Sequence, residues 1–361
     1  MKKLSAFLLL TLLLSACTTA PQLPTEPLPS ATVAPATQTV VPLQGKISLG
    51  YYTGSDASLA AVKNFADSFN TVSADVFGVT PDGKIDGTDP LELMAFTKEH
   101  GIATYLCISN YNSSAQVNDF DPLLAEAAIV TYKTEFIPAI VNQAKIGGYA
   151  GVNIDFESIA FSADLESDRA AYTSFIHDLA LALHTEDLKL IISVPAKTVD
   201  DPADSWSYPF DLASLGQDVD YLQLMTYDAH GPWSEPGPVS GADWVEEVVG
   251  YSSMLVDPAK LLIGLPAYGY DWRSDGTATD VSWVNFPALL TKPGVETGVE
   301  ATSLSPWLTY TEEGLSHTVW YENADSLRAK AALVKRFSLG GLSMWALGKE
   351  DAAFWQAVQT Q

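Results

Sequence analysis

Segment 151–157 (GVNIDFE) carries two carboxylates and an amide at alternate positions. Successive side chains of a strand point to opposite faces, so Asn153, Asp155 and Glu157 would share one face and the three apolar residues between them the other. Burying these polar groups without partners would cost several kcal/mol. The pattern therefore indicates either a site where carboxyl groups act on a ligand or an internal network of polar groups.

Eight segments with the character of β-strands follow one another along the chain, separated by segments with helical periodicity. Several strands are apolar on both faces, which is typical of a parallel sheet covered by helices. The sequence thus predicts an α/β fold, a (β/α)8 TIM barrel rather than an open sheet. The expected strands are 46–52, 71–80, 102–110, 151–157, 188–197, 220–228, 261–270 and 340–347, and the clearest helices are 121–145, 167–185 and 326–338.

In such a barrel Glu157 would come last on the fourth strand, at the C-terminal mouth where barrel enzymes keep their active sites. Barrel interiors are usually packed with branched aliphatic side chains, which favours an active site over a structural polar network. Between the seventh and eighth strands, residues 273–323 include two strand-like runs around Glu312-Glu313-Gly314, which predict a hairpin. We expect a small α+β insertion at the rim, walling one side of a cleft.

Four motifs carry a family resemblance, and they are GYAGVNIDFES (148–158), LQLMTYD (222–228), GLPAYGYDW (264–272) and GGLSMWALGKED (340–351). In this order they resemble glycoside hydrolase family 18, the chitinase family. The resemblance covers residues 45–361 and is strongest to bacterial cell-wall and spore-cortex N-acetylglucosaminidases, although their LysM-type repeats are absent from the sequence. It implies hydrolysis of β-1,4 bonds next to N-acetylglucosamine, in peptidoglycan or chitin-type chains.

The resemblance implies a role for three catalytic residues. Glu157 matches the general acid, and later base, that protonates the glycosidic oxygen. Family 18 is an exception among retaining glycosidases, because the substrate's own 2-acetamido oxygen attacks the anomeric carbon. Asp155 matches the residue that orients the acetamide N–H and offsets the charge of the oxazolinium ion. Tyr227 matches the hydroxyl that holds the acetamide carbonyl in line.

Five further residues are expected to bind substrate or line the pocket. Trp345 matches the aromatic platform beneath the reacting sugar, because the apolar face of a pyranose stacks on an indole. Asp228 is expected to contact sugar hydroxyls or the acid. Gln223 and Met225 share an inward face of the sixth strand and should line the pocket, and Asn153 is expected beside the carboxylates.

Two positions depart from the family's motif, since Asn153 and Ala150 stand where many members have acidic residues. Asn153 is an uncharged isostere that can still hydrogen-bond Asp155. Ala150 lies near the start of the strand, where the residues of a barrel mostly serve stability. Without a second buried carboxylate, we expect Asp155 to ionise more readily, which would flatten the acid limb of the pH profile.

Two other functions remain open. A chitinase-like lectin would bind the same glycans without cutting them, but family members that become lectins usually lose the glutamate, and Glu157 is present. A solute-binding lipoprotein would have a two-lobed open sheet, against which the eight strands argue. The histidines show no close metal spacing and no CxxC, HExxH or P-loop occurs, so no metal and no cofactor are expected. Cys107 reads as a buried inert thiol.

Charge excludes a further class of partner. The chain has 361 residues with 44 acidic against 19 basic side chains, a formal net charge of −25. Such a surface repels phosphate backbones, so nucleic acid and anionic lipid surfaces are poor partners. We expect a monomer whose partner is its glycan substrate.

The N-terminus resembles a targeting segment. A basic start precedes the apolar run 4–14, which has the length of a signal-peptide core, so residues 1–16 are expected to be removed. The run ends in LSAC, which resembles a bacterial lipobox with Cys17 as the lipidated first residue; ordinary secretory cleavage is the alternative. Residues 17–44 read as a disordered Pro/Thr-rich tether. We expect an extracytoplasmic protein of the bacterial cell envelope, bound to the membrane through this lipid only.

Overall fold

A computed structural model describes residues 45–359 of the protein. The expected signal peptide, Cys17 and the tether lie outside the described residues. Within 45–359, no helix combines the length and the apolar character that crossing a membrane requires.

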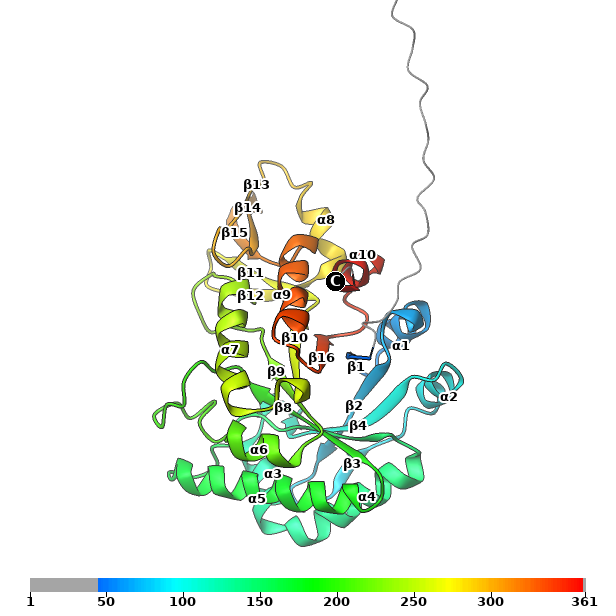
Figure 1. The fold of residues 1–361 in the computed structure, drawn as a ribbon. Helices are drawn as coiled ribbons and strands as arrows, with labels where there is room; N and C mark the ends of the chain where they lie inside the picture. Colours follow the sequence, from blue (N-terminus) through cyan, green and yellow to red (C-terminus); the bar gives the residue numbers. More distant parts are fainter. Residues whose placement is uncertain (1–44, 360–361) are drawn as a thin grey trace, which may run out of the picture. The chain divides into compact units, whose positions relative to one another are not determined.

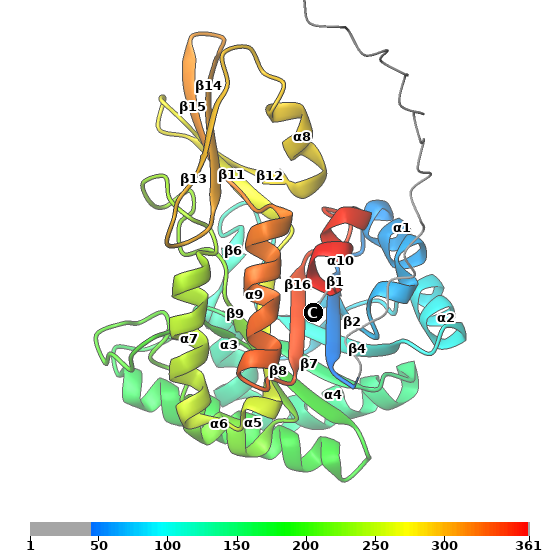
Figure 2. The same cartoon turned by 45° about the horizontal axis from the view of Figure 1, so that its top comes forward.

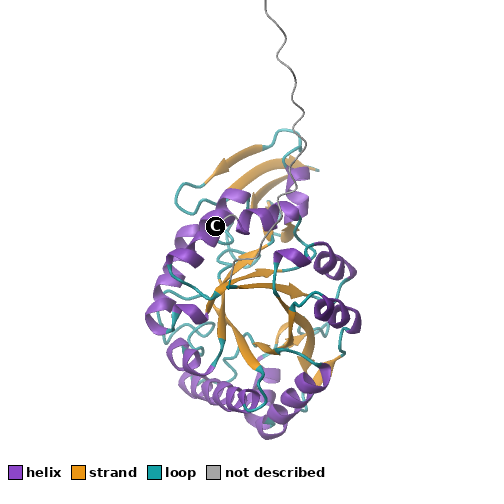
Figure 3. Cartoon of the chain, turned by 45° about the vertical axis from the view of Figure 1, so that its right-hand side comes forward, coloured by secondary structure: helices purple, strands orange, loops and turns teal. Residues whose placement is uncertain are grey.

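Eight strands close into a parallel barrel with helices around its outside, which Figure 3 shows along the barrel. The ring closes because β1 pairs with β2 on one side and with β16 on the other, both in parallel register. The predicted (β/α)8 barrel is confirmed. Its strands are β1 (Ile47–Tyr52), β2 (Thr71–Val79), β4 (Ala103–Ser109), β7 (Gly151–Asp155), β8 (Lys189–Pro195), β9 (Tyr221–Met225), β10 (Leu261–Pro266) and β16 (Gly341–Trp345).

Helices connect successive strands and pack on the outer face of the barrel (Figure 1). The connecting helices are α1 (Asp56–Asn64), α2 (Leu91–Glu99), α3 (Pro122–Glu126), α4 (Lys133–Gly147), α5 (Leu165–His184), α6 (Leu212–Asp218), α7 (Ala242–Leu255) and α9 (Ala324–Arg336), and α10 (Ala352–Gln359) follows the last strand and packs against α9. Short elements complete the barrel: β3 (Ile85–Gly87), β5 (Tyr111–Asn112), β6 (Asp119–Phe120), and the 3₁₀ turns Ala66–Ser68 and Pro258–Lys260.

The predicted helix 121–145 is interrupted. A five-residue π-helical turn, Ala127–Thr131, separates α3 from α4. Leu124 before the turn and Phe136 after it are both buried, so the wider turn resets the helical phase and keeps both apolar faces on the sheet. Gly148 then ends α4 in the left-handed conformation, with φ 74°.

Strand alternation divides the core in two. Val152 and Ile154 of β7 point outwards into the main apolar cluster, which they share with helix residues such as Phe136 and Phe175. The inward positions behave differently, because a smaller cluster that includes Leu49 fills part of the barrel interior and leaves polar residues to face one another there. The outer cluster holds the fold, and the inner face is free to carry chemistry.

The insertion forms a five-stranded antiparallel sheet that stands beyond one end of the barrel (Figure 2). It begins earlier than the sequence predicts, because the expected strand 261–270 ends at Pro266, and Tyr268 already belongs to the insertion sheet. Pro266 is in register with Trp345 of β16, and the Ala267 N–H donates the last barrel hydrogen bond to the Trp345 carbonyl at 2.8 Å before the chain enters the insertion. The elements are β11 (Tyr268–Arg273), β12 (Ala278–Ser282), the 3₁₀ turn Trp283–Asn285, α8 (Phe286–Leu289), β13 (Glu296–Val299), and the predicted hairpin of β14 (Pro306–Glu312) and β15 (Leu315–Trp320).

Candidate active site

A cavity of about 660 Å³ opens at the C-terminal ends of the barrel strands. Six of the eight predicted catalytic and substrate-binding residues line it. The full lining is Tyr51, Asp119, Phe120, Asp155, Glu157, Ser158, Pro195, Ala196, Trp206, Met225, Tyr227, Asp228, Trp233, Trp244, Tyr270 and Trp345. Carboxyl groups and aromatic rings thus meet in one space, although they come from widely separated parts of the chain.

The two expected carboxylates, Asp155 and Glu157, lie at and just after the end of strand β7. Asp155 is its last residue and is 6% exposed, and Glu157 follows at the cavity edge. Asn110, which comes directly after β4 and is fully buried, clamps the backbone of Glu157: its Nδ2 donates to the Glu157 carbonyl at 2.7 Å, and the Glu157 N–H donates to its Oδ1 at 2.9 Å. This backbone clamp fixes the direction of the Glu157 side chain. Asn110 was not predicted from the sequence.

The electrostatic surroundings keep Glu157 protonated. Burial raises its pKa well above the usual range, and the charges of Asp155 and Asp228 raise it further. No ion pair of the described residues involves Glu157 or Asp155. A carboxyl group that holds its proton at neutral pH is what a general acid requires.

A second carboxylate lies beside Asp155, on β2. Oxygens of Asp75 and Asp155 and the sulfur of Cys107 all lie within 4.8 Å of one another. Burial raises the pKa of Asp155 to about 6, against a hydrogen bond from Ser193. Burial and the charge of Asp155 raise the pKa of Asp75 to about 7. The expectation that Asp155 ionises more readily for want of a partner is therefore wrong, because β2 supplies the missing carboxylate.

Among the described residues, this trio is also the group of side chains that could hold a metal ion. Burial raises the pKa of the Cys107 thiol well above its usual range, so the sulfur is a protonated thiol rather than a ligating thiolate. The thiol hydrogen-bonds the Asp75 carboxylate. The chemistry of the trio suits the sharing of protons between carboxyl groups better than the binding of a cation.

Asn153 and Gln223 lie beneath the cavity and not in its lining, and both are fully buried. Asn153 accepts a hydrogen bond from Ser73 Oγ at 2.8 Å and donates to Ser193 Oγ at 3.3 Å. Gln223 Nε2 donates to Ser343 Oγ at 3.0 Å. Asn153 and Gln223 were expected to line the pocket, and this prediction is not met. Alternation along a strand determines which face a side chain lies on but not its depth in the barrel.

Tyr227 follows β9 and reaches the carboxylates. Its ring passes Gly264 of β10, where a Cβ atom would stand 2.6 Å from the ring, so only glycine leaves room for it. Gln223 hydrogen-bonds its side chain from below, and burial, then the charges of Asp155 and Glu157, raise the pKa of Tyr227 well above its usual range. Tyr227 therefore remains a neutral hydroxyl beside the two acids.

Two tyrosines of the insertion hydrogen-bond Asp228, the residue that follows Tyr227. Asp228 has φ 61°, an unusual left-handed conformation for a residue other than glycine. Tyr268 and Tyr270 of β11 donate hydroxyl hydrogen bonds to its Oδ1, at 2.7 and 3.0 Å. Burial raises the pKa of Asp228 despite these bonds and the nearby Lys349 charge. The first strand of the insertion thus orients a cavity carboxylate, a link that the sequence analysis missed.

Aromatic rings form the floor and walls. Trp345, the last residue of β16, packs against Tyr51 with ring centroids 5.3 Å apart, and Met225 fills the space beside them with little exposed surface. Trp206 and Trp233 stand on rim loops and are 44% and 67% exposed. The predicted platform tryptophan therefore lies in the cavity with further rings above it.

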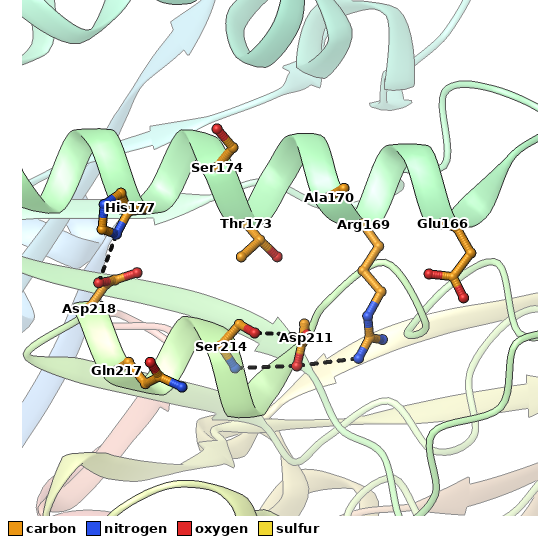
Figure 4. Close-up of a pocket in the computed structure, with 10 residues that line it drawn as sticks. All are labelled: Glu166, Arg169, Ala170, Thr173, Ser174, His177, Asp211, Ser214, Gln217 and Asp218. Atoms are coloured by element: carbon orange, nitrogen blue, oxygen red, sulfur yellow. Dashed lines mark hydrogen bonds and ion pairs between the residues drawn. The ribbon is translucent and has the colours of Figure 1, made fainter.

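A second groove, of about 590 Å³, lies between α5 and α6 on the outside of the barrel (Figure 4). Its charged groups pair with one another: His177 Nδ1 lies 3.0 Å from Asp218, and Arg169 lies 3.3 Å from Asp211. None of the cavity carboxylates lines this groove. It takes no part in the chemistry of the cavity.

A (β/α)8 barrel with carboxyl groups at the strand ends, beneath a cleft of aromatic rings, has the architecture of a glycoside hydrolase. Comparison with known proteins agrees, since residues 48–350 match the family described as Glycosyl hydrolases family 18. The chain therefore belongs to glycoside hydrolase family 18, and the family resemblance of its four motifs is confirmed.

Individual relatives cover most of the chain. The protein "Uncharacterized glycosylase YvbX" of Bacillus subtilis (strain 168) is 35% identical over 318 residues, 87% of this chain and 90% of that protein. A solved chitinase structure from Chromobacterium violaceum ATCC 12472 is 37% identical, with a TM-score of 0.82 over 87% of this chain and 98% of the other. The Bacillus cereus spore cortex-lytic enzyme SleL is 25% identical, with a TM-score of 0.79 over 89% and 74%.

Proposed function

We propose that the protein hydrolyses β-1,4 bonds next to N-acetylglucosamine, in peptidoglycan or chitin-type glycans, with retention of configuration and with the substrate's 2-acetamido group as nucleophile. The observation that carries this proposal is the meeting of Glu157, Asp155 and Tyr227 in one cavity. Chitinases and spore cortex-lytic enzymes among the similar proteins support the substrate class.

In this proposal each of the three groups carries out one step. Glu157, protonated at neutral pH, gives its proton to the glycosidic oxygen as the bond to the leaving sugar breaks. The acetamido oxygen attacks the anomeric carbon, Tyr227 donates its hydroxyl hydrogen to that group, and Asp155 accepts the acetamide N–H and balances the positive charge. The Glu157 carboxylate then takes a proton from water, which opens the ring with overall retention.

Asp155 is poorly placed to act as a covalent nucleophile. It is only 6% exposed and ends β7, whereas Glu157 follows two residues later and is partly exposed. A nucleophilic carboxylate needs to reach the anomeric carbon of the sugar ring. These properties suit an electrostatic partner of the acetamido group.

Digestion of purified peptidoglycan and of chitin oligomers, with products identified by mass, tests the proposal and chooses between the two glycans. We expect products that end in N-acetylglucosamine from at least one of them. Binding of these glycans without any cleavage would overturn the hydrolase proposal in favour of a chitinase-like lectin.

We also propose that the mature chain is a lipoprotein of the bacterial cell envelope, acylated at Cys17 and outside the cytoplasm. The support is the sequence LSAC after a short apolar run, together with the Pro/Thr-rich segment that follows. Intact-mass analysis should find a diacylglycerol-modified Cys17 as the first residue. An unmodified N-terminus at another residue would contradict this.

A further inference from the structure

The carboxyl group of Asp75 reaches the barrel interior through a β-bulge. Ser73 and Asp75 point inwards, but the pairing of β2 with β4 shifts after Asp75, so that Phe77 packs outwards in the main core. Without the extra residue, alternation would turn Phe77 inwards as well. Because of the bulge, Asp75 is the last side chain of β2 that points into the barrel. The proposed function gives its carboxyl group no role.

Asp75 faces Asp155 across β4. Asp75 pairs in register with Cys107, which in turn pairs with Asn153 of β7, and the carboxyl oxygens of Asp75 and Asp155 lie within 4.8 Å of each other. Two carboxylates this close cannot both carry a full charge without a cation between them. No ion pair of the described residues reaches either group.

The other titratable groups around the pair are neutral or acidic. Burial raises the pKa values of the surrounding tyrosines and of the thiol, so they remain protonated near neutral pH, and the remaining neighbours are acids. These groups are Tyr51 of β1, Cys107 of β4, Tyr172 of α5, Tyr227 after β9, and the acids Glu157, Asp228 and Asp119. Since no cationic side chain of the described residues pairs with either carboxylate, a retained proton is the charge that offsets the excess.

We propose that Asp75 is a positioning residue of this hydrolase, which carries the proton of the Asp75–Asp155 pair so that Asp155 presents its charge to the acetamido group. The inference rests on the proposed function, because it assigns Asp155 its role there. Asp75 does not line the cavity, so we expect it to act through Asp155 rather than on the sugar itself. Ser193 hydrogen-bonds Asp155 and lowers its pKa, and the charge of Asp155 raises the pKa of Asp75, which agrees with a proton that resides on Asp75.

Two substitutions separate the hydrogen bond from the charge. In Asp75→Asn the amide still donates to Asp155 but cannot ionise, so the acid limb of the kcat/KM profile should stay in place. The alkaline limb should move to lower pH by roughly half a unit to one unit, because Glu157 loses a like charge. In Asp75→Leu no donor to Asp155 remains, so the acid limb of the kcat/KM profile should move to higher pH by about one unit. At pH values below this limb, kcat/KM should be roughly tenfold lower than in the wild type.

The matched control is Glu350→Gln. Glu350 is another buried carboxyl whose pKa burial raises, but it does not line the cavity. Both limbs should stay in place in this variant. Circular dichroism melting shows whether each variant folds. Folded Asp75→Asn and Asp75→Leu proteins whose limbs coincide with those of the wild type would overturn the proposal and leave Asp75 a space-filling role.

Infrared titration of the full chain tests the proton directly, without substrate. The wild type should show a protonated-carboxyl C=O band that titrates near neutral pH, and Asp75→Asn should lose it, while the Glu157 band persists. The same bands in both proteins would refute the inference. If the wild type cleaves no acetamido glycan, but its band is missing from Asp75→Asn, the proposed function fails while the shared proton is supported.

Discussion

On the barrel side of the cavity, Asp155 and Asn153 are buried among hydrogen bonds that come from several strands. On the rim side, Trp206 and Trp233 stand on loops with 44% and 67% of their surface exposed. The barrel side cannot move without breaking the parallel ladder, whereas the rim side can adjust to a ligand. The chemistry is therefore built into the strands, and we expect the loops to recognise the glycan.

The largest effect should come from the barrel side. Glu157→Gln keeps the shape and removes the transferable proton, so kcat should fall by roughly 10² to 10⁴ while glycan binding survives. The control is Asp119→Asn, a carboxylate of the same cavity that comes from the rim, for which we expect a far smaller loss. Steady-state kinetics with isothermal binding measurements check both. A Glu157→Gln enzyme with the kcat of the wild type would contradict the assignment of the chemistry to the barrel strands.

Tyr227→Phe should have the next largest effect. The change removes one hydroxyl and leaves the ring packed over Gly264, so the loss reports a single hydrogen bond made in the transition state. Such a bond contributes about 1.5 to 3 kcal/mol, or roughly 10- to 100-fold in kcat. KM should change little. A large rise in KM with kcat intact would mean that Tyr227 serves ground-state binding instead.

Substitutions on the rim should act on binding of long chains. Trp233→Ala removes a stacking surface that contributes about 0.5 to 1.5 kcal/mol, so kcat/KM should fall a few-fold for long oligomers and less for short ones. Leu181→Ala, a similarly exposed apolar residue on the outer face of α5, is the control. Equal losses for long and short oligomers would show that Trp233 lines no distal subsite.

The smallest effect concerns stability. The folded-state pKa of Asp75, about 7, lies above its ordinary value of 3.8, so the stability that this group contributes below about pH 4 is lost as the pH rises to about 7. The melting temperature of the wild type should fall by a few degrees over this window. Asp75→Asn should show a flatter dependence, measured by calorimetry. Parallel curves would mean that Asp75 ionises as freely in the folded chain as in the unfolded one.

Much of the fold could be predicted because period-two patterns and apolar faces are local properties of the sequence. The strand that carries Asp155 and Glu157 was recognisable because two carboxylates repeat on one face. Asp75 was not, since it is the one acid of the predicted strand 71–80 and no second carboxylate shares its face. The alternation of Ser73 with Asp75, which repeats that of Asn153 with Asp155, was the available signal.

The depth of a side chain in the barrel and its contacts with distant segments could not be predicted from the sequence. Gln223 and Asn153 were expected at the pocket and lie beneath it, because the register between strands decides which layer of the barrel a side chain occupies. Asn110 holds Glu157 from a different strand, and Tyr268 holds Asp228 from the insertion. Such contacts depend on how the ring closes, which no single segment encodes.

Nuclear magnetic resonance of the first product tests the central claim, that the nucleophile belongs to the substrate, most directly. The measurement follows the anomeric proton during cleavage of an N-acetylglucosamine oligomer and of the same oligomer without its acetyl groups. We expect the β anomer as first product from the acetylated chain and no cleavage of the other. An α anomer as first product, or equal cleavage of both oligomers, would contradict the claim.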